Sequence, residues 1–276
     1  MSTHELPADL ASCVRRALSE DIGKGDLTAA LIPTATQARA EVICREEAVL
    51  CGTAWFDEVF RQLDEEVRID WLAADGDQIH PEQVICKLLG PARSLLSGER
   101  SALNFLQLLS GTASITRQYV GHMGKSKTRL LDTRKTVPGL RTAQKYAVAC
   151  AGGYNHRMGL YDAILIKENH ILAAGSITLA VQQAKTSGHP TEVEVESIDE
   201  LQEAINAGAD SVLLDNFSPE KLLEAVALNA GKVKLEVSGG IEIDRLKEIA
   251  ATGVDYISIG ALTKHVRAVD FSMRIS

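Results

Sequence analysis

The sequence contains few aromatic residues, few prolines and no long apolar run. Aromatic side chains make up 4% of its 276 residues, and only 7 residues are proline. No stretch approaches the roughly 18 consecutive apolar residues of a membrane helix. The opening residues, MSTHELPADL, lack the basic and apolar regions of a secretory signal. We therefore expect a cytoplasmic protein with no membrane segment.

Cysteine and basic charge are also too scarce for several classes of protein. The 5 cysteines form no Cys-x-x-Cys pair, which favours buried free thiols over a disulfide framework or a structural zinc site. Lysine and arginine total 29 against 37 acidic residues, so the net charge is −8. This balance argues against a partner that is nucleic acid or an anionic membrane. A hydrophobic content of 45% is ample for a packed core.

The sequence pattern changes near residue 110. Before it, we expect a small β-rich domain with flanking helices, followed by a long helix over 94–120. After residue 128, short apolar strands alternate with amphipathic helices, which predicts βα units and a parallel sheet. Repetition of this unit favours a closed β/α barrel over an open sheet. The predicted strands of this half are 129–133, 163–167, 192–196, 211–216, 233–239 and 255–260.

Polar residues and glycines follow the apolar bodies of these strands. The active site of a β/α barrel lies at the C-terminal ends of its strands. Lys167 is the sharpest case, because burying an ammonium group is costly unless an anion meets it. The residues at the strand ends are Asp132, Thr133, Arg134 and Lys135, then Lys167, Glu196, Asp215, Asn216, Ser238, Gly239, Gly240, Gly260 and Ala261.

The charges near these ends predict the chemistry of a ligand. Seven basic residues and two acids lie between Arg129 and Lys167, and clustered arginines match a small substrate with several anionic groups. Glycines at the last two strand ends favour a phosphate site over plain turns. Glu196 and Asp215 are candidates to hold Mg²⁺, bind ribose hydroxyls or stabilise a cationic sugar, although a neutralising role beside Lys167 or Arg157 stays open.

Several segments of the chain together form a specific combination. They are EDIGKGDLT (20–28), SGERSALNFLQLLSGTAS (97–114), DTRKTVPGLR (132–141), YNHRMGLYDAILIKENHI (154–171), EVEVE (192–196), LLDN (213–216), EVSGGI (236–241) and ISIGALTKH (257–265). On these segments the chain resembles the quinolinate phosphoribosyltransferase family over nearly its whole length. One departure concerns Ala151, where the family's usual Cys-Gly-Gly-Gly reads Cys-Ala-Gly-Gly; the added methyl is minor unless that backbone needs a positive φ.

The resemblance implies a fold and a reaction. The fold is an N-terminal α/β sandwich, expected at 1–113 with the bridging helix, and an incomplete seven-stranded β/α barrel at 114–276. The seventh strand is expected near 156–158, and the last residues are expected to pack back on the sandwich. The reaction joins quinolinate and phosphoribosyl pyrophosphate, with Mg²⁺, to give nicotinate mononucleotide, pyrophosphate and CO₂ in NAD biosynthesis. A homodimer with shared active sites is also implied.

The resemblance assigns roles by position. Lys135, Lys167, Glu196 and Asp215 are the expected catalytic residues, and Glu196 and Asp215 the expected Mg²⁺ ligands. Quinolinate is expected to meet Thr133, Arg134, His156, Arg157 and Lys167, together with Arg100 of the partner subunit, and phosphoribosyl pyrophosphate to meet Lys135, Glu196, Asp215, Ser238, Gly239, Gly240, Gly260 and Ala261.

Two other functions stay open at this point. A paralogue of the same fold is associated with molybdate transport, but Lys167 in the intact LIKENH segment argues against it. A non-catalytic regulator that binds a sugar phosphate would keep Ser238, Gly239 and Gly240, yet it has no need for Glu196 together with Lys135.

Overall fold

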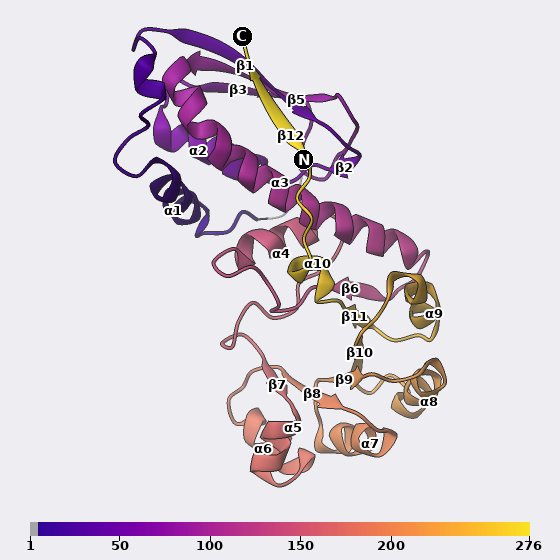
Figure 1. Cartoon of the computed structure of the whole chain (residues 1–276). Coiled ribbons are helices and arrows are strands. Elements are labelled where there is room, and N and C mark those ends of the chain that lie inside the picture. Colours follow the sequence, from indigo (N-terminus) through magenta and orange to yellow (C-terminus); the bar gives the residue numbers. More distant parts are fainter. Residues whose placement is uncertain (1–4) are drawn as a thin grey trace. The chain divides into compact units, whose positions relative to one another are not determined.

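The computed structural model describes residues 5–276, which form two compact units (Figure 1). The first unit comprises residues up to Arg117, Thr136–Gly152 and Ala261–Ser276. The second comprises Gln118–Lys135 and Gly153–Gly260. The chain therefore returns to the first unit twice after leaving it.

The first unit is built on a four-stranded antiparallel sheet in the order β12-β1-β5-β3. Alternation along β1 places Ala40 and Val42 in the core. Val42 pairs with Cys86 of β5 on one side and with Met273 of β12 on the other. The last strand of the chain therefore lies beside the first. The strands of this unit are β1 (Gln37–Cys44), β2 (Ala48–Val49), β3 (Arg68–Trp71), β4 (Gln78–Ile79), β5 (Val84–Pro91) and β12 (Phe271–Ile275).

Helices pack on one face of this sheet and bury its apolar side (Figure 1). The long helix α3 buries an apolar stripe, with Leu95, Leu106 and Leu109 all fully inaccessible. Within residues 5–276 the structure contains no helix apolar and long enough to cross a bilayer. The helices are α1 (Leu10–Ile22), α2 (Thr53–Leu63), α3 (Ala92–His122), α4 (Arg141–Cys150), α10 (Ala261–Lys264) and the 3₁₀ turn η1 (Ala29–Leu31).

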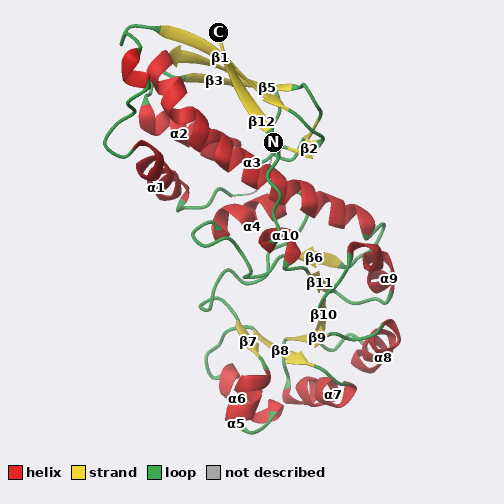
Figure 2. Ribbon diagram, in the orientation of Figure 1, coloured by secondary structure: helices red, strands yellow, loops and turns green. Residues whose placement is uncertain are grey.

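The second unit contains a six-stranded parallel sheet in the order β6-β11-β10-β9-β8-β7, with helices between successive strands (Figure 2). Each strand falls within one residue of a predicted strand, or inside it. The strands are β6 (Arg129–Leu131), β7 (Ile164–Ile166), β8 (Thr191–Val195), β9 (Ser211–Asp215), β10 (Lys234–Ser238) and β11 (Tyr256–Ser258), and the helices α5 (Glu168–Ala174), α6 (Ile177–Lys185), α7 (Ile198–Ala207), α8 (Pro219–Asn229), α9 (Leu246–Ala251) and η2 (Ile243–Arg245).

The seventh strand expected near 156–158 is reduced to one bridge, and it lies slightly earlier. Tyr154 pairs in parallel with Leu131 of the edge strand β6. Its N–H donates to Leu130 (2.8 Å), and its carbonyl accepts from Asp132 N–H (3.1 Å). Arg157 Nη1 then donates to the carbonyl of Ala163, just before the other edge strand, β7 (3.1 Å). We call Tyr154–Met158 the seam segment, because it links the two edges of the sheet.

The interior of the second unit is polar. Side chains alternate along β8, so Val193 and Val195 pack on the helix side while Glu192 and Glu194 point inward. Glu236 of β10 also points inward and is 2% exposed. The buried acids find partners inside the barrel, as charged groups in an interior must.

Candidate functional site

The parallel strands of the second unit bring most predicted site residues to one edge. Lys167 and Glu196 each follow the last residue of a strand, β7 and β8, while Asp215 and Ser238 end β9 and β10. In the register, Val195 lies beside Leu214, so Glu196 and Asp215 occupy neighbouring positions one step beyond. The sheet therefore gathers cations and acids from the ends of β6, β7, β8 and β9, and serine and glycines from the ends of β10 and β11, into one rim.

Lys167 is paired with an acid that the sequence analysis did not single out. Its Nζ donates to Glu194 Oε2, and the lysine side chain is 42% exposed against 15% for the glutamate. Ile166 lies beside Val193 in the register, so Lys167 and Glu194 follow on adjacent strands. The alternation in EVEVE was the available signal, since it places charged residues on one face of a buried strand.

The strand ends of β9 and β10 share a hydrogen-bonded cluster. Ser238 Oγ donates to Asp215 Oδ1 (2.9 Å), and Asn216 Nδ2 donates to Oδ2 (2.7 Å). Gly239 has a φ of +98°, and a Cβ there would collide with the Asn216 side chain. Only glycine therefore fits this turn without strain. Gly240, with a φ of +46°, continues it.

Lys135 lies across the end of β11. A Cβ at Gly260 would stand 2.8 Å from Lys135 Cδ and 3.4 Å from Thr133 Oγ1. Thr133 Oγ1 also accepts the Lys135 N–H (3.1 Å). Glycine at position 260 therefore gives room for the lysine stem. Ala261 follows directly and begins α10.

Arg134 lies near enough to Arg157 for its positive charge to affect the pKa of Arg157. Burial, and then the charge of Arg134, lowers the pKa of Arg157, while Glu192 and Asp162 act in the opposite direction. Asp162 also accepts the N–H groups of Met158 (2.6 Å) and Gly159 (3.1 Å), which fixes the turn after the seam segment. Two arginines held this close favour an anionic ligand between them.

His156 is engaged by the protein at both ring nitrogens. Nε2 contacts Glu192 Oε2 (2.9 Å) and Glu236 Oε2 (3.4 Å), and Nδ1 accepts the N–H of Arg157 (2.7 Å). Burial opposes the charged ring, but hydrogen bonds to the two glutamates outweigh it and raise the pKa of His156 to about 10. A direct contact between this ring and quinolinate stays a prediction.

Arg100 belongs to the first unit, where it is exposed on α3. The EDIGKGDLT segment is fixed to this helix one turn earlier, because Ser97 Oγ donates to Asp26 Oδ2 (2.8 Å). The carboxylate of Asp26 also accepts the N–H groups of Thr28 and Ala29. Ala151, in the same unit, has a φ of −88°, so its methyl group causes no backbone strain.

Among residues 5–276, two clusters have donor atoms close enough for a metal ion, and neither contains Glu196 or Asp215. One joins Cys51, Asp75 and Cys150; the other joins His156, Glu192 and Glu236. In the first cluster, Asp75 already accepts two N–H groups at the start of α2 and the hydroxyl of Tyr146. All five cysteines are buried free thiols, as the sequence analysis predicts.

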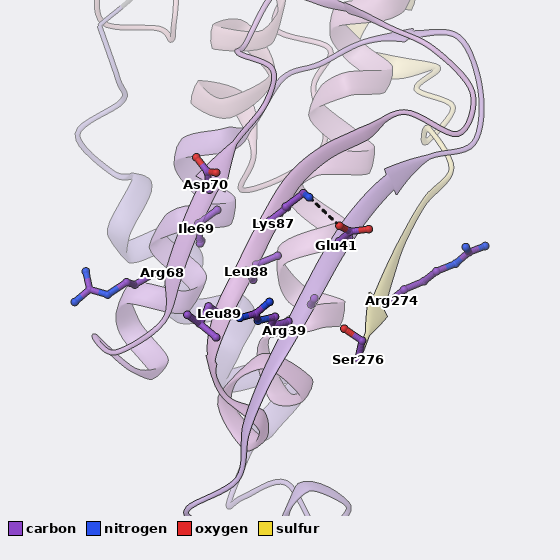
Figure 3. A pocket seen from close by; sticks show the side chains of 11 residues that line it. Arg39, Glu41, Arg68, Ile69, Asp70, Lys87, Leu88, Leu89, Arg274 and Ser276 are labelled. Atoms are coloured by element: carbon purple, nitrogen blue, oxygen red, sulfur yellow. Dashed lines mark ion pairs between the residues drawn. The ribbon is translucent and has the colours of Figure 1, made fainter.

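A separate cavity of about 570 Å³ lies on the antiparallel sheet of the first unit (Figure 3). Its charged side chains partly neutralise one another, with Lys87 paired to Glu41 at 3.2 Å. None of the predicted site residues, all of which lie in the described part of the chain, lines this cavity. The lining residues are Arg39, Ala40, Glu41, Arg68, Ile69, Asp70, Lys87, Leu88, Leu89, Arg274 and Ser276.

Comparison with known proteins identifies the family. The models of the N-terminal and C-terminal domains of quinolinate phosphoribosyl transferase match residues 26–110 and 112–274. A probable carboxylating nicotinate-nucleotide pyrophosphorylase of Bacillus subtilis is 46% identical over 93% of this chain and 90% of its own length.

Solved structures agree with that result. The nicotinate-nucleotide pyrophosphorylase of Francisella tularensis is 50% identical, with a TM-score of 0.94 over 99% of this chain and 98% of its own. NadC of Streptococcus pyogenes is 40% identical, with a TM-score of 0.96 over 100% and 99% of the two chains. The predicted fold class, a sandwich domain with a barrel-like domain, is confirmed. The chain belongs to the quinolinate phosphoribosyl transferase family.

Proposed function

We propose that this protein is a carboxylating nicotinate-nucleotide pyrophosphorylase of NAD biosynthesis. It transfers the phosphoribosyl group of phosphoribosyl pyrophosphate to quinolinate and releases pyrophosphate and CO₂. The observation that carries the proposal is the single rim on which Lys135 and Lys167 stand with Glu196 and Asp215. The site needs both positive and negative side chains, because the substrates are polyanions and the reacting sugar becomes cationic.

The basic side of the rim suits quinolinate, a dianion. Arg134 and Arg157 are placed to bind one carboxylate with paired hydrogen bonds, and Thr133 lies beside them. Lys167 is placed for the other carboxylate, which would replace Glu194 as its partner. His156 supports Arg157, because its Nδ1 accepts the backbone N–H of that residue.

The acidic side suits the ribose of phosphoribosyl pyrophosphate. The turn of Ser238, Gly239 and Gly240, together with Gly260 and Ala261 after β11, offers backbone N–H groups to the 5′-phosphate. Glu196 and Asp215 lie close to the sugar carbon that reacts, and Lys135 faces the pyrophosphate.

The acids Glu196 and Asp215 also fit Mg²⁺, which prefers carboxylate oxygens. Asp215 is held by Ser238 and Asn216, so its carboxylate is oriented, and Glu196 is exposed at the adjacent position. When bound, Mg²⁺ would offset negative charge on the leaving pyrophosphate. Lys135 supplies a second positive charge to the same group.

The chemistry follows from these positions. As the bond from C1 to pyrophosphate breaks, positive charge develops on the sugar, and the carboxylates of Glu196 and Asp215 stabilise it. The quinolinate nitrogen then bonds to C1 and becomes cationic. The adjacent 2-carboxylate departs as CO₂, the cationic ring nitrogen stabilises the electron pair left on C2, and that carbon takes a proton from water to give nicotinate mononucleotide.

The direct test is release of CO₂ from carboxyl-labelled quinolinate. We expect release only with phosphoribosyl pyrophosphate and Mg²⁺, and EDTA should abolish it. Nicotinate lacks the 2-carboxylate and should be a poor substrate, because the lost charge-assisted bonds are worth roughly 1.5–3 kcal/mol each. Equal kcat/KM for the two acids would exclude this function, and no turnover of either acid would favour the paralogue or the regulator.

We also propose a cytoplasmic homodimer in which Arg100 completes the partner's site. Its exposure on α3 and its place in the first unit support this role. Arg100→Ala and Glu196→Ala variants should each be nearly inactive. After subunit exchange, about a quarter of all sites should recover, because half the dimers are mixed and one site in each is whole. No recovery, with exchange verified by native mass measurement, would exclude the shared site.

A further inference from the structure

A buried hydrogen-bonded bridge crosses the interior of the second unit. His156 Nε2 lies 2.9 Å from Glu192 Oε2 and 3.4 Å from Glu236 Oε2. The glutamates come from β8 and β10, and the histidine comes from the seam segment. The three side chains are 15%, 9% and 2% exposed for His156, Glu192 and Glu236. Such burial is costly for ionic groups, so a bridge of this kind needs a reason beyond stability.

At neutral pH the cluster of His156, Glu192 and Glu236 keeps one proton that the same three groups would lose if they stood apart in water. The neighbouring carboxylates raise the pKa of His156 despite its burial, and burial raises the pKa of Glu236. Glu236 Oε1 is buried without a hydrogen-bond partner among residues 5–276, although Ser258 of β11 faces the same carboxyl group. A neutral carboxyl group tolerates that position better than a carboxylate. Asp132, after β6, accepts the backbone N–H of His156 (2.9 Å) and the side-chain amide of Asn155 (2.7 Å).

The tautomer of His156 distinguishes this bridge from a metal site. The Arg157 N–H donates to Nδ1, so Nδ1 carries a lone pair and the ring proton is on Nε2. A metal ion among these groups would need the lone pair on Nε2 instead. The geometry therefore describes a proton shared at Nε2 between the ring and two glutamates.

We propose that Glu192 and Glu236 are positioning residues, which act through His156 to orient Arg157 toward quinolinate. The ring is held by the two glutamates at Nε2 and holds the Arg157 backbone at Nδ1. This proposal rests on the proposed function, because that function assigns quinolinate to Arg157.

The seam segment explains why such a bridge is needed. Its backbone pairs with β6 at Tyr154. On the β7 side, the side chain of Arg157 donates to the carbonyl of Ala163. Side-chain hydrogen bonds therefore set the direction of Arg157, and the loss of Nε2 partners lets the ring and the arginine turn together.

The first readout separates the two substrates. Glu192→Gln and Glu236→Ala should raise the KM for quinolinate by about tenfold, because a misplaced binding group loses much of its interaction. The KM for phosphoribosyl pyrophosphate should change far less. Glu236→Gln is neutral and of the same shape, so it should retain most of the quinolinate affinity. Glu224→Gln, exposed on α8 of the same unit, is the matched control and should behave like the unaltered protein.

The second readout needs no activity. In protein labelled with ¹⁵N-histidine, and assigned with His156→Asn, the His156 ring should keep its Nε2 proton and show no titration from pH 6 to 8. The ring should titrate in that range once Glu192 is Gln. An ordinary titration near pH 6.5 in the unaltered protein overturns the proposal, as does an unchanged quinolinate KM in both Glu192→Gln and Glu236→Ala.

The two readouts also separate this proposal from the proposed function. If the ring behaves as expected but quinolinate is not turned over, the proposed function fails while the bridge stands. If quinolinate is turned over and the variants raise both KM values equally, the positioning role fails while the function stands.

Discussion

Replacing Lys167 with methionine tests the cation that follows β7. The lysine is 42% exposed and pairs with Glu194, which is 15% exposed. Methionine keeps the apolar stem and removes the ammonium group, so it leaves no large cavity. The ion pair and the proposed contact with the second carboxylate of quinolinate are both lost.

The two losses differ in size. A hydrogen bond between an ammonium group and a buried substrate carboxylate contributes roughly 1.5–3 kcal/mol, which corresponds to about a 10- to 150-fold loss of kcat/KM. The pair with Glu194 is partly exposed, so its loss should lower the free energy of unfolding by about 1 kcal/mol or less. Catalysis should therefore suffer far more than folding.

The assay is CO₂ release from labelled quinolinate, with urea unfolding of the same samples. Adding Glu194→Gln to Lys167→Met removes the unpaired carboxylate, so stability should recover while turnover should not. If Lys167→Met retains full kcat/KM, the reasoning is refuted and Lys167 serves only as the structural partner of Glu194.

Three other variants or conditions test separate parts of the site. Gly239→Ala should raise the KM for phosphoribosyl pyrophosphate, because the new Cβ collides with Asn216 at a φ of +98°; an unchanged KM would argue against this turn as the phosphate site. Asp215→Asn should lower kcat by at least about tenfold and weaken activation by Mg²⁺, which a Mg²⁺ titration of the rate would detect. Although burial opposes the charged ring, Glu192 and Glu236 raise the pKa of His156 to about 10, so the folded bridge of these three residues holds a proton, shared at Nε2, that the unfolded chain releases near pH 6.5. The free energy of unfolding should therefore fall as pH rises from 6.5 to 10, by up to about 1.4 kcal/mol per pH unit, and His156→Asn should flatten this slope in urea melts at each pH.

The alternating and helical patterns predict the strands of the barrel well, because those patterns are local. The six strands, the rim that they form and the long helix α3 all follow from apolar periodicity and the residues that end each run. The family and fold class are confirmed by the comparisons. The rim residues Lys167, Glu196 and Asp215 could be named for the same reason, since a parallel sheet brings all its strand ends together.

The seam segment could not be predicted in the same way. Its backbone makes a single bridge at Tyr154, and its other links run through Asp132, His156 and Arg157. Such links join residues far apart in the sequence, and no local period encodes them. A strand was therefore expected two residues later, where side chains do the binding instead.

The sequence did not reveal which acid pairs with each interior cation, and the reason is related. EVEVE shows that Glu192 and Glu194 share a face with Glu196, but not which cation each one meets. That choice depends on the register between β7 and β8 and on closure of the barrel by the seam segment. Sequence alone therefore located the charges, and the fold determined their pairing.

The interior acids solve a problem created by the proposed substrates. A site for two polyanions must gather cations, and burial followed by the charge of Arg134 lowers the pKa of Arg157, so these cations repel one another before substrate binds. Glu194 beneath Lys167 and Glu192 beneath Arg157 offset part of this repulsion. The acids lie on the inner face of one strand, below the rim, so they do not occupy the substrate's place. The barrel thus holds its cations together without lining the mouth with competing carboxylates, except where Glu196 and Asp215 face the cationic sugar.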